Sequence, residues 1–232
     1  MIKLLSFQGA LFSNMIVVEN KMDYASKLLL SDNNLFDVEP TILPIPNDAP
    51  IDLPRVILKS KNGDFVCNTS LSRVDLFYNV KKDPECDLRN VKSKFFPLLI
   101  NTINFLNDSY KIKINRIGLV SSFVLELSDS SNKYILQKYL NENGLISDTS
   151  EIQLNVLNRL ELLSKYKINR WLRIRSLRDK PNVVNDKFCS VKIDINTPAE
   201  IAYDIDREVA SLIFTEAIKN MEEVLKTHYG NI

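Results

Sequence analysis

Two successive patterns of apolar and polar residues mark the carboxyl-terminal part of the chain. From Lys187 to Ile195 the residues alternate, so that Cys189, Val191 and Ile193 would share one face and polar residues the other. This period of two predicts a half-buried strand. After the strand, apolar residues recur at steps of three and four, which predicts one long amphipathic helix. The helical set is Ile201, Ile205, Val209, Leu212, Ile213, Met221, Val224 and Leu225.

Residue types at both ends of this segment predict where the helix begins and ends. Thr197 is suited to the N-cap position and Pro198 to the first turn, so the helix is expected to begin near Ala199. Gly230 is expected to end it. The apolar stripe has two interpretations. It covers the chain's own sheet, or part of it forms an oligomer seam or a groove for a partner.

Alternation also dominates the first half of the chain. A strand, or two short ones, is predicted between Leu4 and Val18, and a short helix from Tyr24 to Leu30. From Arg55 the period is again two, and the Asn62-Gly63 pair predicts a hairpin turn. The expected product is a three-stranded antiparallel meander that ends before Pro84.

A proline-spaced segment precedes this meander, with prolines at 40, 44, 46, 50 and 54. Proline forbids helix here and keeps the backbone extended. The interleaved residues Ile42, Leu43, Ile45, Ile51 and Leu53 are more apolar than a solvated linker requires. We therefore expect the segment to lie against the body of the fold.

The remaining elements fall into two halves that share a strands-then-helix order. A helix is predicted over 87–107, where Pro97 either kinks it or marks its first turn near Phe96. A strand over 111–127, a helix over 130–143 that stops at Gly144, and extended segments over 150–163 and 166–177 follow. This order predicts an α+β fold with mainly antiparallel sheet, in halves 1–110 and 111–232 packed as one unit. Whether the halves form one sheet or two stays open.

Five short stretches of the chain carry a resemblance. They are LPR before a strand, NGD at the hairpin, SRVDLFYNV, NRIGLV and KIDIN before the long helix. Together they resemble a sporadically distributed bacterial family of conserved hypothetical proteins, over nearly the whole chain. That resemblance implies no assigned activity and no catalytic residues. In outline, an antiparallel sheet closed by a long helix is also similar to SecB-type export chaperones, which is an analogy of fold alone.

Composition bears on partners and compartment. The 232 residues have a formal net charge of +1, which gives no global attraction for nucleic acid or anionic membranes. The three cysteines, Cys67, Cys86 and Cys189, are widely spaced and odd in number. That usage fits a reducing compartment, and we expect the cytoplasm. No apolar run is long enough to span a bilayer, so no membrane is expected.

The residues that usually carry catalysis are scarce. His228 is the single histidine, and the five glycines make no phosphate loop or dinucleotide fingerprint. We therefore expect no enzymatic activity, no cofactor and no metal. An unfamiliar carboxylate site around Asp194 is a third, weaker possibility, because no second acidic residue is spaced to share a metal with it.

A basic stretch between Arg159 and Lys192 stands out locally. If 166–177 is a strand, Lys167, Asn169, Trp171, Arg173 and Arg175 share one face. A cationic face with the only tryptophan could follow a phosphate backbone and stack a base. Alternatively, these charges form a solvated face or pair with the acidic last helix.

Taken together, the sequence predicts a bacterial or phage-related interaction module whose partner is another protein, a second copy, or both. It would be chaperone-like or antitoxin-like, or a subunit of a defence-type complex. The proline-spaced segment belongs to the expected interface, with Trp171, Arg173, Arg175, Val209, Leu212 and Ile213 as its candidate residues. The alternative is a nucleic-acid-binding module that uses Lys167, Arg170, Trp171, Arg173, Arg175 and Arg178.

Overall fold

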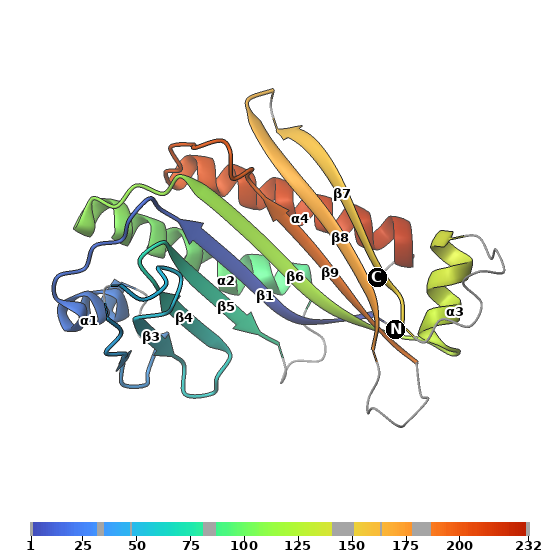
Figure 1. Ribbon diagram of the computed structural model, residues 1–232, viewed down its shortest axis with the longest axis horizontal. Coiled ribbons are helices and arrows are strands. Elements are labelled where there is room, and N and C mark those ends of the chain that lie inside the picture. The colour runs from blue at the N-terminus through green and yellow to red at the C-terminus, as the bar shows by residue number, and fades with distance from the viewer. Residues whose placement is uncertain are drawn as a thin grey trace.

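A single antiparallel sheet organises the fold, in the order β2-β3-β4-β5-β1-β6-β9-β8-β7 (Figure 1). The computed structural model describes residues 2–31, 35–46, 48–80, 87–140, 151–162, 164–177 and 187–230. The strands are β1 (Ile2–Phe12), β2 (Thr41–Ile42), β3 (Val56–Lys59), β4 (Phe65–Thr69), β5 (Arg73–Asn79), β6 (Arg116–Glu126), β7 (Gln153–Leu162), β8 (Tyr166–Leu177) and β9 (Phe188–Asn196). The predicted α+β class is confirmed.

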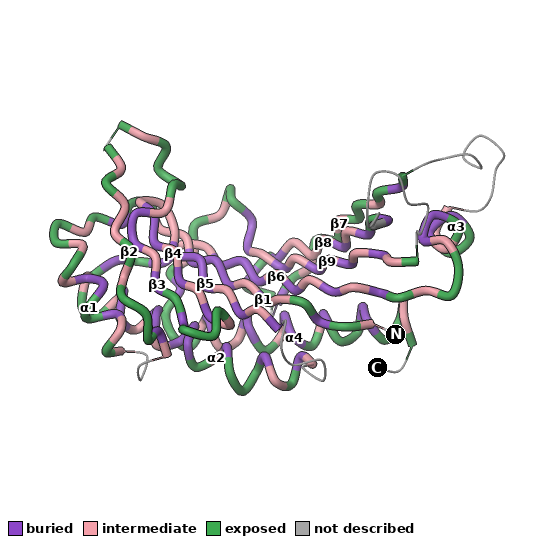
Figure 2. Tube along the Cα trace, turned by 90° about the horizontal axis from the view of Figure 1, so that it is seen from below, coloured by how far each residue is buried: buried purple, intermediate pink, exposed green. Residues whose placement is uncertain are grey.

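Two long helices cover one face of this sheet. They are α2 (Leu88–Asn104), which continues as a π-helical turn over Phe105–Ser109, and α4 (Arg207–Tyr229). Figure 2 shows both on the same side of the strands. The shorter α1 (Lys21–Ser31) packs beside β3 and α2. The helix α3 (Ser131–Ile135) continues as a π-helical turn over Leu136–Leu140 and packs beside β8.

Strands from both halves of the chain share the sheet. β1 lies at the centre and pairs with β5 on one side and with β6 on the other. The sequence left open whether there are two sheets, and the strands in the described part of the chain form one. The Asn62-Gly63 hairpin and the meander β3-β4-β5 are confirmed, and Gly63 adopts the positive φ of 75° that the turn requires.

The core lies between the sheet and the helices α2 and α4. Phe7 of β1 is fully buried there, with its ring 5.0 Å from that of Phe95 in α2 and 6.0 Å from that of Phe214 in α4. Gly9, two residues along β1, lets α2 approach closely, since a Cβ there would lie 3.0 Å from the Phe95 ring. Aromatic packing of this kind fixes how the helices sit on the sheet.

The long helix begins later than its apolar pattern indicates. Asp206, not Thr197, is the N-cap, and its carboxylate accepts the backbone N–H of Val209 at 2.9 Å. Thr197 instead extends the sheet, because its N–H donates to the Ile117 carbonyl and its hydroxyl accepts the Ile117 N–H. The predicted start near Ala199 is therefore wrong. The predicted end is confirmed, with Gly230 at a φ of 83°.

The first long helix resolves the alternatives that Pro97 left open. Asp87 caps α2 and accepts the backbone N–H groups of Arg89 and Asn90, so the helix does not begin near Phe96. Pro97 lies inside α2 on its exposed side. Several residues named above lie outside the described part of the chain, namely Pro84, Cys86, Gly144 and Arg178.

Candidate interaction surface

The two faces of the sheet differ in what covers them. Register places Gln8, Asp75, Val120, Trp171 and Asp194 on the side opposite α2 and α4. We call this side the open face, because neither long helix lies over it (Figure 2). On the covered face the same strands point Phe7, Leu119, Ile193 and Leu172 toward the core. The open face is the first candidate surface for a partner.

Residues 43–46 and 48–54, here called the proline loop, project beyond this sheet on the open-face side (Figure 2). The loop connects β2 to β3 and carries Ile51 and Leu53, whose exposed fractions are 58% and 41%. The expectation that these residues lie against the body of the fold is therefore wrong for both. Proline fixes φ and restricts the conformations of such a loop. Less backbone entropy is therefore lost in holding its apolar side chains in one place at the surface.

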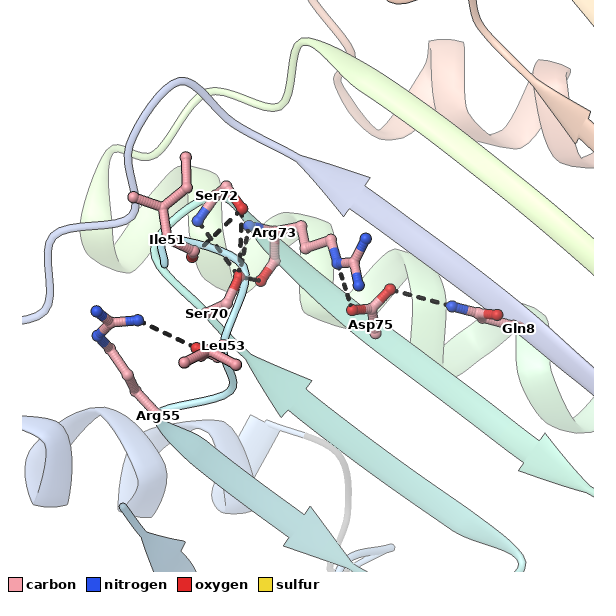
Figure 3. Close-up of polar contacts among 8 residues, drawn as sticks. All are labelled: Gln8, Ile51, Leu53, Arg55, Ser70, Ser72, Arg73 and Asp75. Atoms are coloured by element: carbon pink, nitrogen blue, oxygen red, sulfur yellow. Dashed lines mark hydrogen bonds and ion pairs between the residues drawn. The ribbon is translucent and has the colours of Figure 1, made fainter. Parts of the chain in front are cut away.

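A buried arginine anchors the base of the proline loop (Figure 3). Only 4% of Arg55 is exposed, and its guanidinium donates to the carbonyl oxygens of Leu53 at 3.1 Å and Pro46 at 3.3 Å. A buried charge is costly unless hydrogen bonds compensate it. Here the compensating acceptors are loop carbonyls, so burial of Arg55 and the shape of the loop depend on each other.

The turn between β4 and β5 holds the loop from the other side. The N–H of Leu71 donates to the Ile51 carbonyl at 3.0 Å. The Ser72 hydroxyl donates to the same oxygen at 3.4 Å (Figure 3). The N–H of Ile16 donates to the Leu71 carbonyl at 2.7 Å, so the segment after β1 joins this end of the sheet. That segment carries two further exposed side chains. The apolar rim is thus Met15, Val17, Ile51 and Leu53.

A polar network crosses the open face next to this rim. Asp75 is buried and lies between Arg73, whose Nε is 2.7 Å from its carboxylate, and Gln8, whose amide donates to it at 3.1 Å (Figure 3). Burial raises the pKa of Asp75, and the Arg73 charge and the two hydrogen bonds offset this only in part. The charges here are paired within the chain and not offered to a ligand.

The basic stretch is also paired internally. Trp171, Arg173 and Arg175 lie on the open face of β8, as predicted from the alternation. The Arg173 guanidinium lies 3.2 Å from the Asp194 carboxylate and 5.5 Å from the centre of the Trp171 ring. Arg175 pairs with Glu151 at 2.7 Å. The charges of Arg173 and Arg175 are therefore paired within the chain, which favours a compensated polar face over a phosphate-binding track.

Not all candidate nucleic-acid residues share this face. Arg170 lies on the covered face and donates to the side-chain oxygen of Asn220 in α4 at 3.1 Å. Its grouping with Trp171 is therefore wrong, since the register puts Arg170 beside Ile195. Lys167 is exposed on the open face, and Arg178 lies outside the described residues.

The three candidate interface residues of the last helix lie on the opposite side of the sheet from Trp171. Ile213 is fully buried, while Val209 and Leu212 are partly buried and pack against the core. This part of the stripe covers the chain's own sheet, as the first of the two interpretations expected. The helix residues and the β8 residues cannot form one continuous interface.

The remaining reactive side chains occupy structural positions. Burial raises the pKa of the Cys189 thiol to about 11, so the thiol stays protonated near neutral pH. Asp194 is held by Arg173 and by the Asn196 amide at 2.8 Å. Within the described ranges, no group of three or more His, Cys, Asp or Glu side chains is arranged to hold a metal ion.

Sequence reasoning missed the exposure of the apolar rim. The apolar residues between the prolines predict packing against the fold, but the loop contacts the fold through its backbone carbonyls and Arg55. The close spacing of the prolines was the signal in the sequence for this exposure, because proline fixes φ and a stiff loop can hold apolar side chains at the surface.

Comparison of the chain with protein-family models, with curated proteins and with solved structures gives no match. Among the helices in the described part of the chain, none is both long enough and apolar enough to cross a bilayer.

Proposed function

We propose that this protein is a non-enzymatic interaction module that binds another protein through its apolar rim. The observation that carries the proposal is the buried Arg55, whose guanidinium holds the carbonyls of Leu53 and Pro46 while Ile51 and Leu53 remain exposed. Exposed apolar side chains on a fixed support are typical of binding sites, since pre-organisation lowers the entropy lost on binding. A chaperone-like or antitoxin-like protein, or a subunit of a defence-type complex, fits this use.

Photo-crosslinking in the cells that make the protein tests the proposal. A benzophenone amino acid replaces Met15, which lies in the rim and is 60% exposed. We expect one discrete adduct with another protein, reduced about tenfold by the double change Ile51→Ser and Leu53→Ser, because removal of anchor side chains weakens an interface strongly.

The matched control uses α1, where Met22 and Leu30 are 59% and 75% exposed. The double change Met22→Ser and Leu30→Ser removes similar apolar area away from the rim and should leave the adduct intact. Equal loss in both double variants, or no discrete adduct from position 15, would contradict the proposal.

A second candidate function is nucleic-acid binding, supported by Lys167, Trp171, Arg173 and Arg175 on the open face. Fluorescence anisotropy with a random single-stranded oligonucleotide separates the two. Phosphate binding would weaken steeply with salt and with the double change Arg173→Ala and Arg175→Ala. Binding of a protein partner at the apolar rim, measured by the crosslinked adduct, should change little with salt or with the double change Arg173→Ala and Arg175→Ala.

A further inference from the structure

The two edges of the sheet are built differently. At one edge β2 has two residues, Thr41–Ile42, and prolines stand on both sides of it. At the other edge β7 runs for 10 residues and pairs only with β8, and no other strand of the described chain lies on its outer side. Natural edge strands are often protected by brevity, proline, charged side chains or a bulge. Of these, β7 has only the charges of Arg159 and Glu161, since its sequence is QLNVLNRLEL and its register is continuous.

The outward backbone groups of β7 can be identified from its pairing. The N–H of Ser176 donates to the Ile152 carbonyl at 3.1 Å, so even-numbered residues of this segment direct their backbone groups toward β8. Odd-numbered residues therefore direct their N–H and C=O groups outward. These are Gln153, Asn155, Leu157, Arg159 and Glu161.

The outward side of β7 is complementary to itself. When a second copy is turned by 180° about an axis through Leu157, the two leucines meet at the axis. Asn155 then faces Arg159 of the other copy, and Gln153 faces Glu161, so each charged side chain meets an amide that can hydrogen-bond to it. On the covered-face side, Leu154 faces Leu160.

Neighbouring registers are less favourable. With the axis at Val156, Glu151 would face Glu161 of the second copy, and directly opposed like charges are destabilising. With the axis at Asn158, Leu157 would face Arg159, which leaves the charge without a polar partner. The axis at Leu157 thus pairs all the outward residues and also covers Val156, which is 38% exposed in the single chain.

We infer that two copies of this protein associate through β7, in antiparallel register about Leu157, to form one continuous sheet with both open faces on the same side. The rotation axis is perpendicular to the sheet, so the covered faces also stay together. The five outward residues of each copy supply about ten hydrogen bonds between the strands. The inference does not depend on the apolar rim, which lies at the other end of the strand order.

Sedimentation velocity of the purified chain over about 1–200 µM tests this inference, because an interface of one strand pair is small and its dissociation constant is expected in the micromolar range. We expect a dimer at the upper concentrations. The change Asn155→Arg places an arginine opposite Arg159 twice per dimer and should weaken association about tenfold. Both positions are exposed, so the monomer should keep its fold.

The double change Asn155→Arg and Arg159→Asn restores an arginine facing an asparagine and should restore the dimer. In the single and in the double variant the new arginine at position 155 lies opposite Arg173 of the same chain. If the double variant dimerises again, the weakening in the single variant therefore came from contact between the two copies and not from repulsion within one sheet. A wild-type chain that stays monomeric throughout, a single variant that dimerises normally, or a double variant as weak as the single would overturn the inference. Circular dichroism of each variant verifies its fold.

Discussion

Adjacent residues of β1 show how differently the two faces of the sheet are stabilised. Phe7 points into the covered face, where it is fully buried between the rings of Phe95 and Phe214. Gln8 points to the open face, where its amide donates to the carboxylate of Asp75. The covered face is held by apolar burial and the open face by polar side chains that pair with one another. Because successive side chains of a strand point to opposite faces of the sheet, β1 contributes to two chemically different surfaces.

This difference bears on where a partner binds. The charges at the centre of the open face are paired within the chain, as Arg73 is with Asp75 and Arg173 with Asp194. Paired surface charges contribute little to binding unless the pairs are broken. The apolar rim and the outer edge of β7 lack such internal compensation, and our two proposals concern these margins of the sheet.

Two phenylalanines of β1 provide the largest contrast between the faces. We expect Phe7→Ala to lower the free energy of unfolding by about 3–5 kcal/mol, because it leaves a cavity against both long helices. Phe12 lies on the open face, half-buried under the Arg116 guanidinium, 3.9 Å from its ring centre. Phe12→Ala should cost about 1–2 kcal/mol, since that ring is only partly buried and no helix packs over it. Urea unfolding measures both, and equal losses would show that the faces are not energetically distinct.

Two glycines on neighbouring strands sharpen the contrast with one identical substitution. A Cβ at Gly9 would lie 3.0 Å from Phe95 and 3.2 Å from Leu99, so Gly9→Ala should destabilise the protein by about 1–3 kcal/mol. A Cβ at Gly118 on the open face would have its nearest contact at 3.6 Å. Gly118→Ala should therefore be neutral or stabilise by up to about 1 kcal/mol, because alanine has less freedom in the unfolded chain. Thermal unfolding of both variants reports the sign, and a destabilising Gly118→Ala would contradict the assignment of faces.

The smallest effect concerns Asp75 and is the one that depends on pH. Asp75→Asn should change the free energy of unfolding by less than about 1 kcal/mol at neutral pH, because the lost attraction to Arg73 and the relieved burial cost of the carboxylate largely offset each other. Burial raises the pKa of Asp75 in the folded state above its ordinary value of 3.8. As pH falls through that raised pKa toward 3.8, the folded wild type gains a proton before the unfolded chain does, and this stabilises it. The stability of the wild type relative to the asparagine variant should therefore rise as the pH falls from 7 to 4, as measured by urea unfolding of both proteins. A relative stability that falls over that range would contradict the prediction.

Much of the fold could be predicted because its elements are encoded locally. The alternation of β8 and β9, the turn at Asn62-Gly63 and the end of α4 at Gly230 each depend on a few neighbouring residues. The same alternation correctly placed Trp171, Arg173 and Arg175 on one face. Local pattern failed at the start of α4, where Thr197 had a suitable residue type for a helix cap but formed hydrogen bonds with Ile117 across the sheet instead.

By itself, the sequence determined the α+β class and the position of most strands and helices, because hydrophobic period and turn chemistry act over a few residues. Only the tertiary structure decided that one sheet unites both halves, that Ile213 is buried while Ile51 is exposed, and that β7 is an edge. Those properties depend on which distant segments pack together. The physical reason is that burial and pairing are properties of contacts between segments, and an apolar residue has the same chemistry whether a helix covers it or water does.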